Sequence, residues 1–193
     1  PRKLQIDESP QKLFQVDHHI GIAAAGYIPD ARNQVDDARF FSQSNKLVYD
    51  EPVDVETVAK HLADQAQHYT QYAGVRPFGV ALIIGGIDQQ GSSLFLTDPS
   101  GTYIPYNAVA IGSNSDKVTE FLRKEYKNDI TIDDAKILAI AGINEVAENT
   151  EDSNHIKMSQ IINDTKHFKI LSDEEVAKIA QISKEKYAIE PKK

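Results

Sequence analysis

The sequence predicts an α+β sandwich, in which pairs of helices cover the faces of antiparallel sheets. Strand-like and helix-like segments follow in the order strands, two helices, strands, two helices, strands, helix. Short turn signals join neighbouring strands, which favours antiparallel pairing over the single alternation of a doubly wound fold. The length of 193 residues favours one domain spanning 1–193, since about 150 residues per domain is typical.

The first part of the chain predicts two strands followed by a helix. The strands are residues 12–17 and 20–25, and Asp17-His18-His19 form the turn between them. Helical spacing begins near Ile28, and Pro29 suits the first turn of a helix because its missing N–H is not needed there. The predicted apolar face consists of Ile28, Ala31, Val35, Ala38 and Phe41.

A charged repeat and a second helix come next. Asp-Ala-Arg occurs at 30–32 and again at 37–39, which predicts a charged stripe that faces solvent or an interface. The second helix is predicted over 54–72, with Asp54 as its N-cap. Its apolar stripe consists of Val55, Val58, Ala59, Leu62, Ala66 and Tyr69.

The middle of the chain predicts the core strands. Residues 79–88 are almost continuously apolar, which is typical of a strand covered on both faces. Residues 92–97 and 102–111 predict further strands, and the turn signal at 98–101 between them favours a hairpin.

The last third of the chain predicts helices with strong start signals. Thr131 with Asp134 and Ser172 with Glu175 have the spacing of capping boxes, and residues 187–193 are expected to be a flexible tail. The predicted elements are helices at 115–127, 131–148 and 173–186, strands at 157–163 and 167–171, and a loop at 148–154.

Composition excludes several classes of function. The chain has no cysteine, which excludes a disulfide scaffold, a thiolate zinc site, an iron–sulfur cluster and a cysteine nucleophile. Its 21 basic and 29 acidic residues give a net charge of −8, which disfavours nucleic acid and anionic membranes as main partners. No apolar run approaches the ~18 residues of a transmembrane helix, and no signal peptide is recognisable at the N-terminus.

A search for catalytic motifs finds none. Phosphate-binding loops, dinucleotide fingerprints, nucleophile elbows and His-Glu-x-x-His are all missing from the sequence. The adjacent carboxylates at 36–37 and 133–134 point about 100° apart on a helix and cannot converge. Nothing around Pro1 supports its use as an amine nucleophile. We therefore expect no catalytic residue and no cofactor.

Four histidines are candidate metal ligands, but the sequence disfavours that role. His61 and His68 lie seven residues apart on a predicted helix, whereas helical metal pairs are usually three or four apart, and polar residues surround them. A solvated role is favoured for them and for the turn residues His18 and His19, so we predict no metal site. Arg76 is interpreted as fastening a loop through backbone carbonyls.

Several segments, read in order, resemble α subunits of the proteasome, and in particular the archaeal branch. The resemblance runs from about Ser9 to Lys186 and implies the four-layer αββα sandwich of N-terminal-nucleophile hydrolases. The segments that carry it are Gly26-Tyr27-Ile28-Pro29-Asp30-Ala31-Arg32, residues 69–82, 94–103, 110–113 and 120–126.

The resemblance implies a non-catalytic subunit of the proteasome core particle. In this family two heptameric α rings cap two β rings, and the β subunits carry the N-terminal threonine protease. The α ring templates the β ring, controls substrate entry and docks regulatory ATPases. The implied partners are other α subunits, proteasome β subunits and the C-terminal tails of the ATPases, in the cytoplasm.

The resemblance also implies a docking pocket for those tails between neighbouring α subunits. Lys12, in the segment Ser9-Pro10-Gln11-Lys12-Leu13, takes the place of the lysine that pairs with the tail carboxylate. A carboxylate that leaves water needs such a cation and hydrogen-bond donors. Gly26 and Tyr27 would form the pocket wall, where the family commonly has leucine in place of Tyr27, so the wall differs in shape.

The front of the chain departs from the family. The family carries about fifty further residues before the position of Pro1, including a first helix and two strands, without which the sandwich exposes an unpaired edge. We therefore expect an incomplete sequence that is less stable or prone to aggregation on its own. Two alternatives stay open: an active β-type peptidase subunit with an N-terminal nucleophile, and a stand-alone binding module of the same fold.

Overall fold

The computed structural model describes residues 11–147 and 156–187, and within them the predicted order of elements is confirmed. The predicted loop at 148–154 and nearly all of the predicted tail lie outside the described residues. The elements are β1 (Leu13–Asp17), β2 (Ile20–Gly26), α1 (Ile28–Tyr49), α2 (Val55–Tyr69), β3 (Val80–Ile87), β4 (Ser92–Thr97), β5 (Tyr103–Pro105), α3 (Ser115–Glu125), α4 (Ile132–Val146), β6 (Ser159–Ile161), β7 (Phe168–Ile170) and α5 (Asp173–Tyr187).

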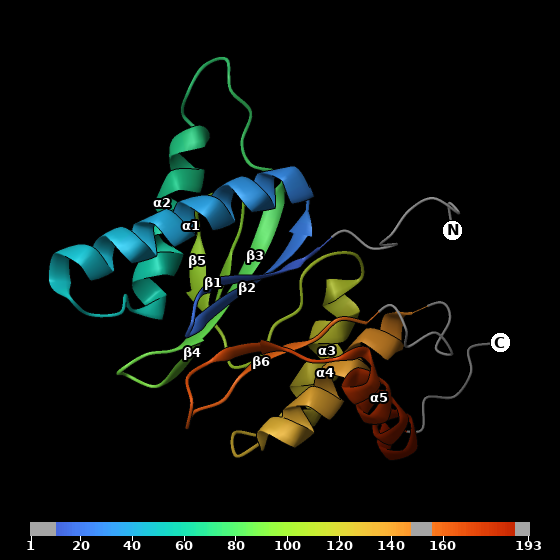
Figure 1. Ribbon diagram of the computed structural model, residues 1–193. Coiled ribbons are helices and arrows are strands. Elements are labelled where there is room, and N and C mark those ends of the chain that lie inside the picture. Colours follow the sequence, from blue (N-terminus) through green and yellow to red (C-terminus); the bar gives the residue numbers. More distant parts are fainter. Residues whose placement is uncertain (1–10, 148–155, 188–193) are drawn as a thin grey trace, which may run out of the picture.

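A five-stranded antiparallel sheet in the order β1-β2-β3-β4-β5 forms the centre of the molecule. The chain leaves β2, forms α1 and α2, and returns to pair β3 with β2 from Ile20–Gly86 to Gly26–Val80. Both helices therefore cover one face of the sheet (Figure 1). Side chains that alternate along the strands, such as Ile22, Leu82 and Ile84, point into the core beneath these helices and are almost fully buried.

The other face of the sheet meets a second, smaller layer. β6 and β7 pair as a two-stranded antiparallel sheet, and the N–H of Phe168 donates to the carbonyl of His18 at 2.6 Å. α4 and α5 pack beyond this hairpin, and α3 packs on α4 (Figure 1). The buried cluster that joins them consists of Ile140, Met158, Leu171, Val176 and Ala180. The order helix pair, sheet, sheet, helices is the αββα sandwich that the resemblance implied.

Several predicted elements are shorter in the structure, and β5 and α2 are the clearest cases. The strand predicted over 102–111 ends at Pro105, which opposes Phe95 at the edge of the sheet. Proline has no N–H to continue a ladder, so a strand ends readily there. α2 ends at Tyr69 rather than 72, and the hydroxyl of Thr70 closes it by donating to the carbonyl of Gln67 at 2.6 Å.

The predicted start residues of three helices are confirmed, including Asp54 as the N-cap of α2, although only two of the three side chains form the cap hydrogen bond. The N–H of Asp134 donates to Thr131 Oγ1 at 3.2 Å, and that of Glu175 donates to Ser172 Oγ at 3.2 Å. The Asp54 side chain makes no cap hydrogen bond, and instead Asp88 Oδ2, beyond the end of β3, accepts the N–H of Val55 at 3.0 Å. No helix in the described ranges combines the length and the apolar character that crossing a membrane requires.

Candidate functional site

The three residues predicted to dock a regulator lie at one end of the five-stranded sheet. Lys12 precedes β1, and its carbonyl accepts the N–H of Ala24 on β2 at 2.9 Å. Ala24 lies two residues before Gly26, which ends β2, and Tyr27 is the N-cap of α1. The structure therefore brings Lys12 close to the point where the chain passes from β2 into α1.

Gly26 allows two backbone segments to approach closely at this point. Its φ of +127° lies in the region that favours glycine, and a Cβ at this position would lie 2.3 Å from the carbonyl oxygen of Gly79. The same carbonyl accepts the N–H of Tyr27 at 2.8 Å. Any side chain at position 26 would force the loop before β3 away from α1.

An ion pair between the buried Asp30 and the exposed Arg76, which the sequence did not predict, fastens this junction. Arg76 Nη1 donates to Asp30 Oδ2 at 2.6 Å and Nη2 donates to Oδ1 at 2.8 Å, while the N–H of Gly79 donates to Oδ2 at 2.8 Å. The hydrogen bonds from Arg76 lower the pKa of Asp30 even though its burial opposes this. Asp30 is therefore no part of a solvated stripe, and Arg76 fastens the loop mainly through a carboxylate rather than through carbonyls.

The Tyr27 ring forms an exposed aromatic wall beside Gly26. A Cβ on Gly79 would lie 2.2 Å from this ring, so glycine at position 79 gives the ring its place. The guanidinium of Arg76 lies 5.4 Å from the ring centre, within the range of a cation–π contact. The Lys12 side chain is exposed, and its ammonium has no hydrogen bond or ion pair within the described residues. The exposed Lys12, the first turn of α1 and the Tyr27 ring thus lie at the same end of the sheet.

The second half of the predicted charged stripe also faces the protein. His61 Nε2 lies 2.6 Å from Asp37 Oδ2, and the imidazole stacks on Phe41 with 4.0 Å between ring centres. The prediction of a solvated face is therefore wrong for His61, which links α2 to α1. His68 is exposed on α2, and its ring lies roughly perpendicular to that of Tyr72, with 4.6 Å between ring centres.

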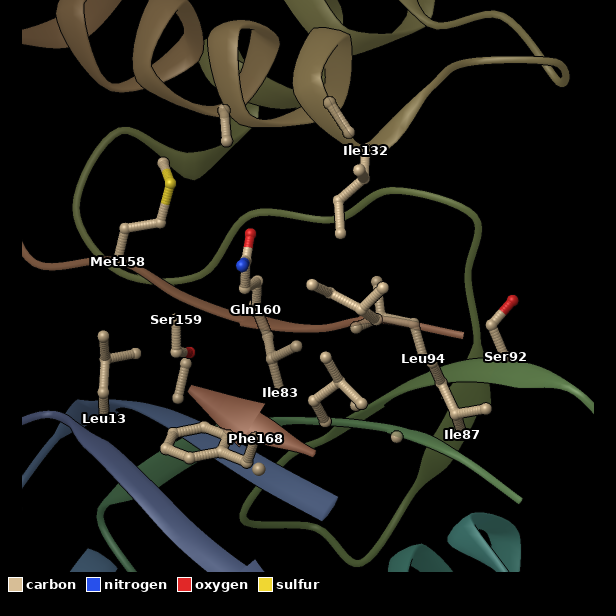
Figure 2. Close-up of a pocket in the computed structure, with 18 of the residues that line it drawn as sticks. Leu13, Ile83, Ile87, Ser92, Leu94, Ile132, Met158, Ser159, Gln160 and Phe168 are labelled. Carbon is tan, nitrogen blue, oxygen red and sulfur yellow. The ribbon is translucent and has the colours of Figure 1, made fainter. Parts of the chain in front are cut away.

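A cavity of about 870 Å³ separates the sheet from α4 and the β6-β7 hairpin (Figure 2). Apolar side chains dominate its wall, among them Ile83 and Leu94 from the sheet, Ile132 from α4, and Phe168 from the hairpin. The described residues that line it include no carboxylate and no histidine. The wall is therefore mainly apolar packing surface, and Lys157 is the charged residue among the described residues that line it.

Comparison with known proteins shows to which family the chain belongs. A family model described as proteasome subunit matches residues 2–161. The chain belongs to the proteasome subunit family. It is 41% identical over 180 residues to the proteasome subunit alpha of Methanosarcina acetivorans, and the match covers 93% of this chain and 73% of the relative. The resemblance to the α type of proteasome subunits is thereby confirmed.

Other archaeal relatives carry the same name. The proteasome subunit alpha of Archaeoglobus fulgidus is 41% identical over 174 residues, which covers 90% of this chain and 70% of the relative. That of Saccharolobus islandicus is 48% identical over 136 residues, which covers 70% of this chain and 56% of the relative. The docking role of Lys12, Gly26 and Tyr27 remains a prediction within this family, since no observation above tests it.

Proposed function

We propose that this chain is a non-catalytic structural subunit in the outer α ring of a proteasome core particle. In that place it templates the β ring, controls the entry of substrates and docks regulatory ATPases, in the cytoplasm. The observation that carries the proposal is the 41% identity over 180 residues to a proteasome subunit alpha. An active β-type peptidase is not favoured, because these relatives are α subunits.

The outer surface of α1 supports a place in a ring. Its C-terminal half exposes Phe40, Leu47, Val48 and Tyr49, and Leu47 is 87% accessible. In Figure 1 this end of the helix extends beyond the strands of the sheet. Large apolar side chains that gather on a surface are typical of protein–protein contacts, and a neighbouring subunit would remove them from water.

The junction of β2 and α1 supports the docking of a regulator tail. The Lys12 ammonium would pair with the terminal carboxylate, since charge-assisted hydrogen bonds are about twice as strong as neutral ones. The positive end of the α1 helix dipole also favours an anion, although Pro29 contributes no N–H to this turn. Gly26 leaves room for a peptide backbone, and the Tyr27 ring offers it an apolar face.

The docking role is tested on particles assembled from this chain and its β subunit. A short peptide with the C-terminal sequence of a proteasomal regulatory ATPase is added as free acid and as amide, and hydrolysis of a fluorogenic peptide is followed. We expect the free acid to stimulate hydrolysis. Lys12→Ala should lower the apparent affinity of the particle for the peptide at least tenfold, because one charged hydrogen-bonded pair contributes about 1.5–3 kcal/mol.

Lys46→Ala is the matched control, because Lys46 is an exposed lysine near the other end of α1. It should leave stimulation unchanged. Equal stimulation of the Lys12→Ala and wild-type particles, or equal stimulation by acid and amide, would overturn the docking role while leaving the place in the ring intact.

A further inference from the structure

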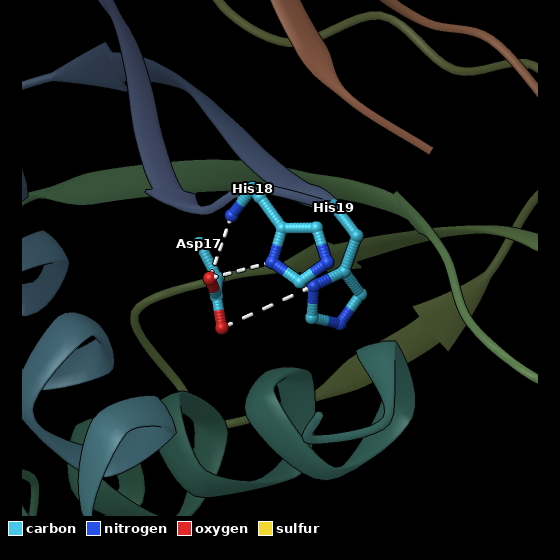
Figure 3. Close-up of side chains that lie close together, drawn as sticks. All are labelled: Asp17, His18 and His19. Atoms are coloured by element: carbon cyan, nitrogen blue, oxygen red, sulfur yellow. Dashed lines mark hydrogen bonds and ion pairs between the residues drawn. The ribbon is translucent and has the colours of Figure 1, made fainter. Parts of the chain in front are cut away.

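The turn between β1 and β2 gathers three side chains that have no part in the proposed docking site. Asp17 ends β1, His18 and His19 form the connection, and Ile20 begins β2. One ligand atom from each of Asp17, His18 and His19 lies within 4.8 Å of the others (Figure 3). Figure 3 shows the Asp17 carboxylate facing the imidazole rings of His18 and His19 at this turn.

Burial distinguishes this group from an ordinary solvated turn. The His19 side chain is 2% accessible and that of Asp17 is 9% accessible, whereas His18 is 39% accessible. Asp17 Oδ1 accepts the N–H of His18 at 2.6 Å and lies 3.0 Å from its Nδ1. Among the described residues, Asp17 Oδ2 and His19 Nδ1 are both buried without a hydrogen-bond partner. The solvated role that the sequence favoured is therefore wrong for His19.

The tautomer of His19 explains why burying Asp17 Oδ2 and His19 Nδ1 without a partner costs free energy. Its Nε2 lies 2.8 Å from the carbonyl oxygen of Val53, which can only accept, so Nε2 carries the proton. In the neutral ring Nδ1 then holds only a lone pair, and it faces Asp17 Oδ2 at 3.9 Å. Two buried acceptors that face each other are costly unless a positive species lies between them.

The distances suit a metal ion better than a proton. A separation of 3.9 Å is too long for a direct hydrogen bond. Zinc holds nitrogen and oxygen at 2.0–2.2 Å, which sets neighbouring tetrahedral ligands roughly 3.3–3.6 Å apart. A shift of a few tenths of an ångström would bring Asp17 Oδ2 and His19 Nδ1 to that separation.

The surroundings resemble those of histidines that bind metals. Such a histidine usually donates its second ring N–H to a carbonyl or carboxylate, as His19 does to Val53. The partly exposed His18 leaves a path from solvent to the group.

We propose that Asp17, His18 and His19 bind a first-row divalent transition metal of the zinc class. Two imidazoles with one carboxylate suit Zn²⁺ or Co²⁺, whereas Mg²⁺ and Ca²⁺ prefer sites made entirely of oxygen. Water completes the coordination. Because the carbonyl of His18 accepts the N–H of Phe168, the metal would stabilise the seam between the two sheets. The inference does not depend on the proposed place in the ring.

The test uses the untagged full chain, stripped of metal with a chelator and titrated with ZnCl₂, CoCl₂ and MgCl₂ in a calorimeter. We expect one equivalent of Zn²⁺ and of Co²⁺ to bind with micromolar or tighter affinity, with no binding of Mg²⁺. Co²⁺ should give the visible absorption of a four-coordinate nitrogen–oxygen site, and Zn²⁺ should raise Tm.

Asp17→Asn and His18→Ala should each weaken Zn²⁺ binding at least tenfold, since even the outer partners of metal ligands contribute ten- to hundredfold. His68→Ala is the control, because it also removes one histidine but from the exposed face of α2. Circular dichroism checks that each variant folds. If Asp17→Asn does not fold, His18→Ala still tests the proposal, because His18 is partly exposed. The absence of Co²⁺ absorption in the wild-type chain, or unchanged Zn²⁺ affinity in both variants, would overturn the proposal.

Discussion

Asp30 and Arg76 determine how the loop before β3 meets the first turn of α1. The carboxylate is 7% accessible and receives three hydrogen bonds, two from the guanidinium and one from the N–H of Gly79. A buried carboxylate without these donors would be costly, so the pair holds the two segments together. The same segments form the wall of the proposed docking site.

Asp30→Asn should lower the free energy of unfolding by about 1–2 kcal/mol at pH 7, because the bidentate pair is lost while the guanidinium stays solvated. The pKa of Asp30 is lower in the fold than its ordinary value of 3.8, so this stabilisation is present above that value and is lost as the pH falls below it. Urea denaturation at pH 7 and near pH 3 measures both effects. Asp36→Asn, at an exposed pair with Arg39, is the control and should change stability by less than about 0.5 kcal/mol.

Gly26→Ala should destabilise the fold by about 2 kcal/mol or more, because strained φ values alone cost about 1–3 kcal/mol and the new Cβ would also meet the Gly79 carbonyl. Gly74→Ala separates the two causes, since Gly74 has a φ of +87° with nothing within 4 Å of an added Cβ. Gly74→Ala should lower the free energy of unfolding only by the cost of the strained φ value, without the cost of a steric clash. Equal losses of stability in the two variants would contradict the close approach at Gly26.

Helix α5 begins with the most complete cap in the described chain. The Glu175 carboxylate accepts from Lys169 Nζ at 2.8 Å and from the N–H of Ser172 at 2.8 Å, and Ser172 Oγ accepts the N–H of Glu175. The hydrogen bond from Lys169, followed by that from Ser172, lowers the pKa of Glu175 from 4.5 to about 2. The cap thus joins α5 to β7 through a charged group.

Glu175→Gln should therefore lower stability at neutral pH, and the difference from the wild type should shrink as the pH falls from 4.5 to about 2. The folded state favours the ionised Glu175 carboxylate, so its contribution to stability is present above the pKa of the unfolded chain. That contribution is lost when the carboxylate is protonated in the folded state. Chemical denaturation across that pH range measures it. Glu174→Gln changes a carboxylate one residue earlier in the same turn and serves as the control. A difference that does not change with pH would contradict the charged cap.

The exposed apolar side chains at the C-terminal end of α1 are predicted to contact a neighbouring subunit in the ring. Leu47→Asp places a charge in the apolar surface of Phe40, Leu47, Val48 and Tyr49, and it should weaken ring formation at least tenfold, because burying an unpaired charge in an interface is costly. Stability of the isolated chain should change little, since the side chain is exposed. Gln181→Asp adds the same charge at an exposed position of α5, on the other side of the sheet, and should assemble normally. Size-exclusion chromatography with light scattering separates the outcomes.

At the scale of the whole molecule, local patterns predicted the layers well. The apolar spacing of α1, the continuous run of β3 and the capping boxes at Thr131 and Ser172 each depend on neighbours within a few residues. The turn residues between β4 and β5 also act locally, since Asp98 Oδ1 accepts the N–H of Ser100 at 2.8 Å. Such features are readable from one sequence.

The unpredicted features all depend on tertiary pairing. Asp30 meets Arg76 across 46 residues, and Val55 is capped by Asp88 across 33 residues. Both partners are ordinary surface residue types, so no local pattern marks them. His19 is similar, because only the fold brings the Val53 carbonyl to its ring and buries it. The docking residues came from the resemblance alone, since a lysine before a strand has no distinctive spacing.

The central claim is that this chain forms the α ring of a proteasome, and native mass spectrometry tests it most directly. The untagged chain is produced together with the β subunit of its own organism, and the purified complex is weighed and imaged by negative-stain electron microscopy. We expect sevenfold rings that contain this chain and stack on β rings. A chain that stays monomeric and does not bind the β subunit would contradict it.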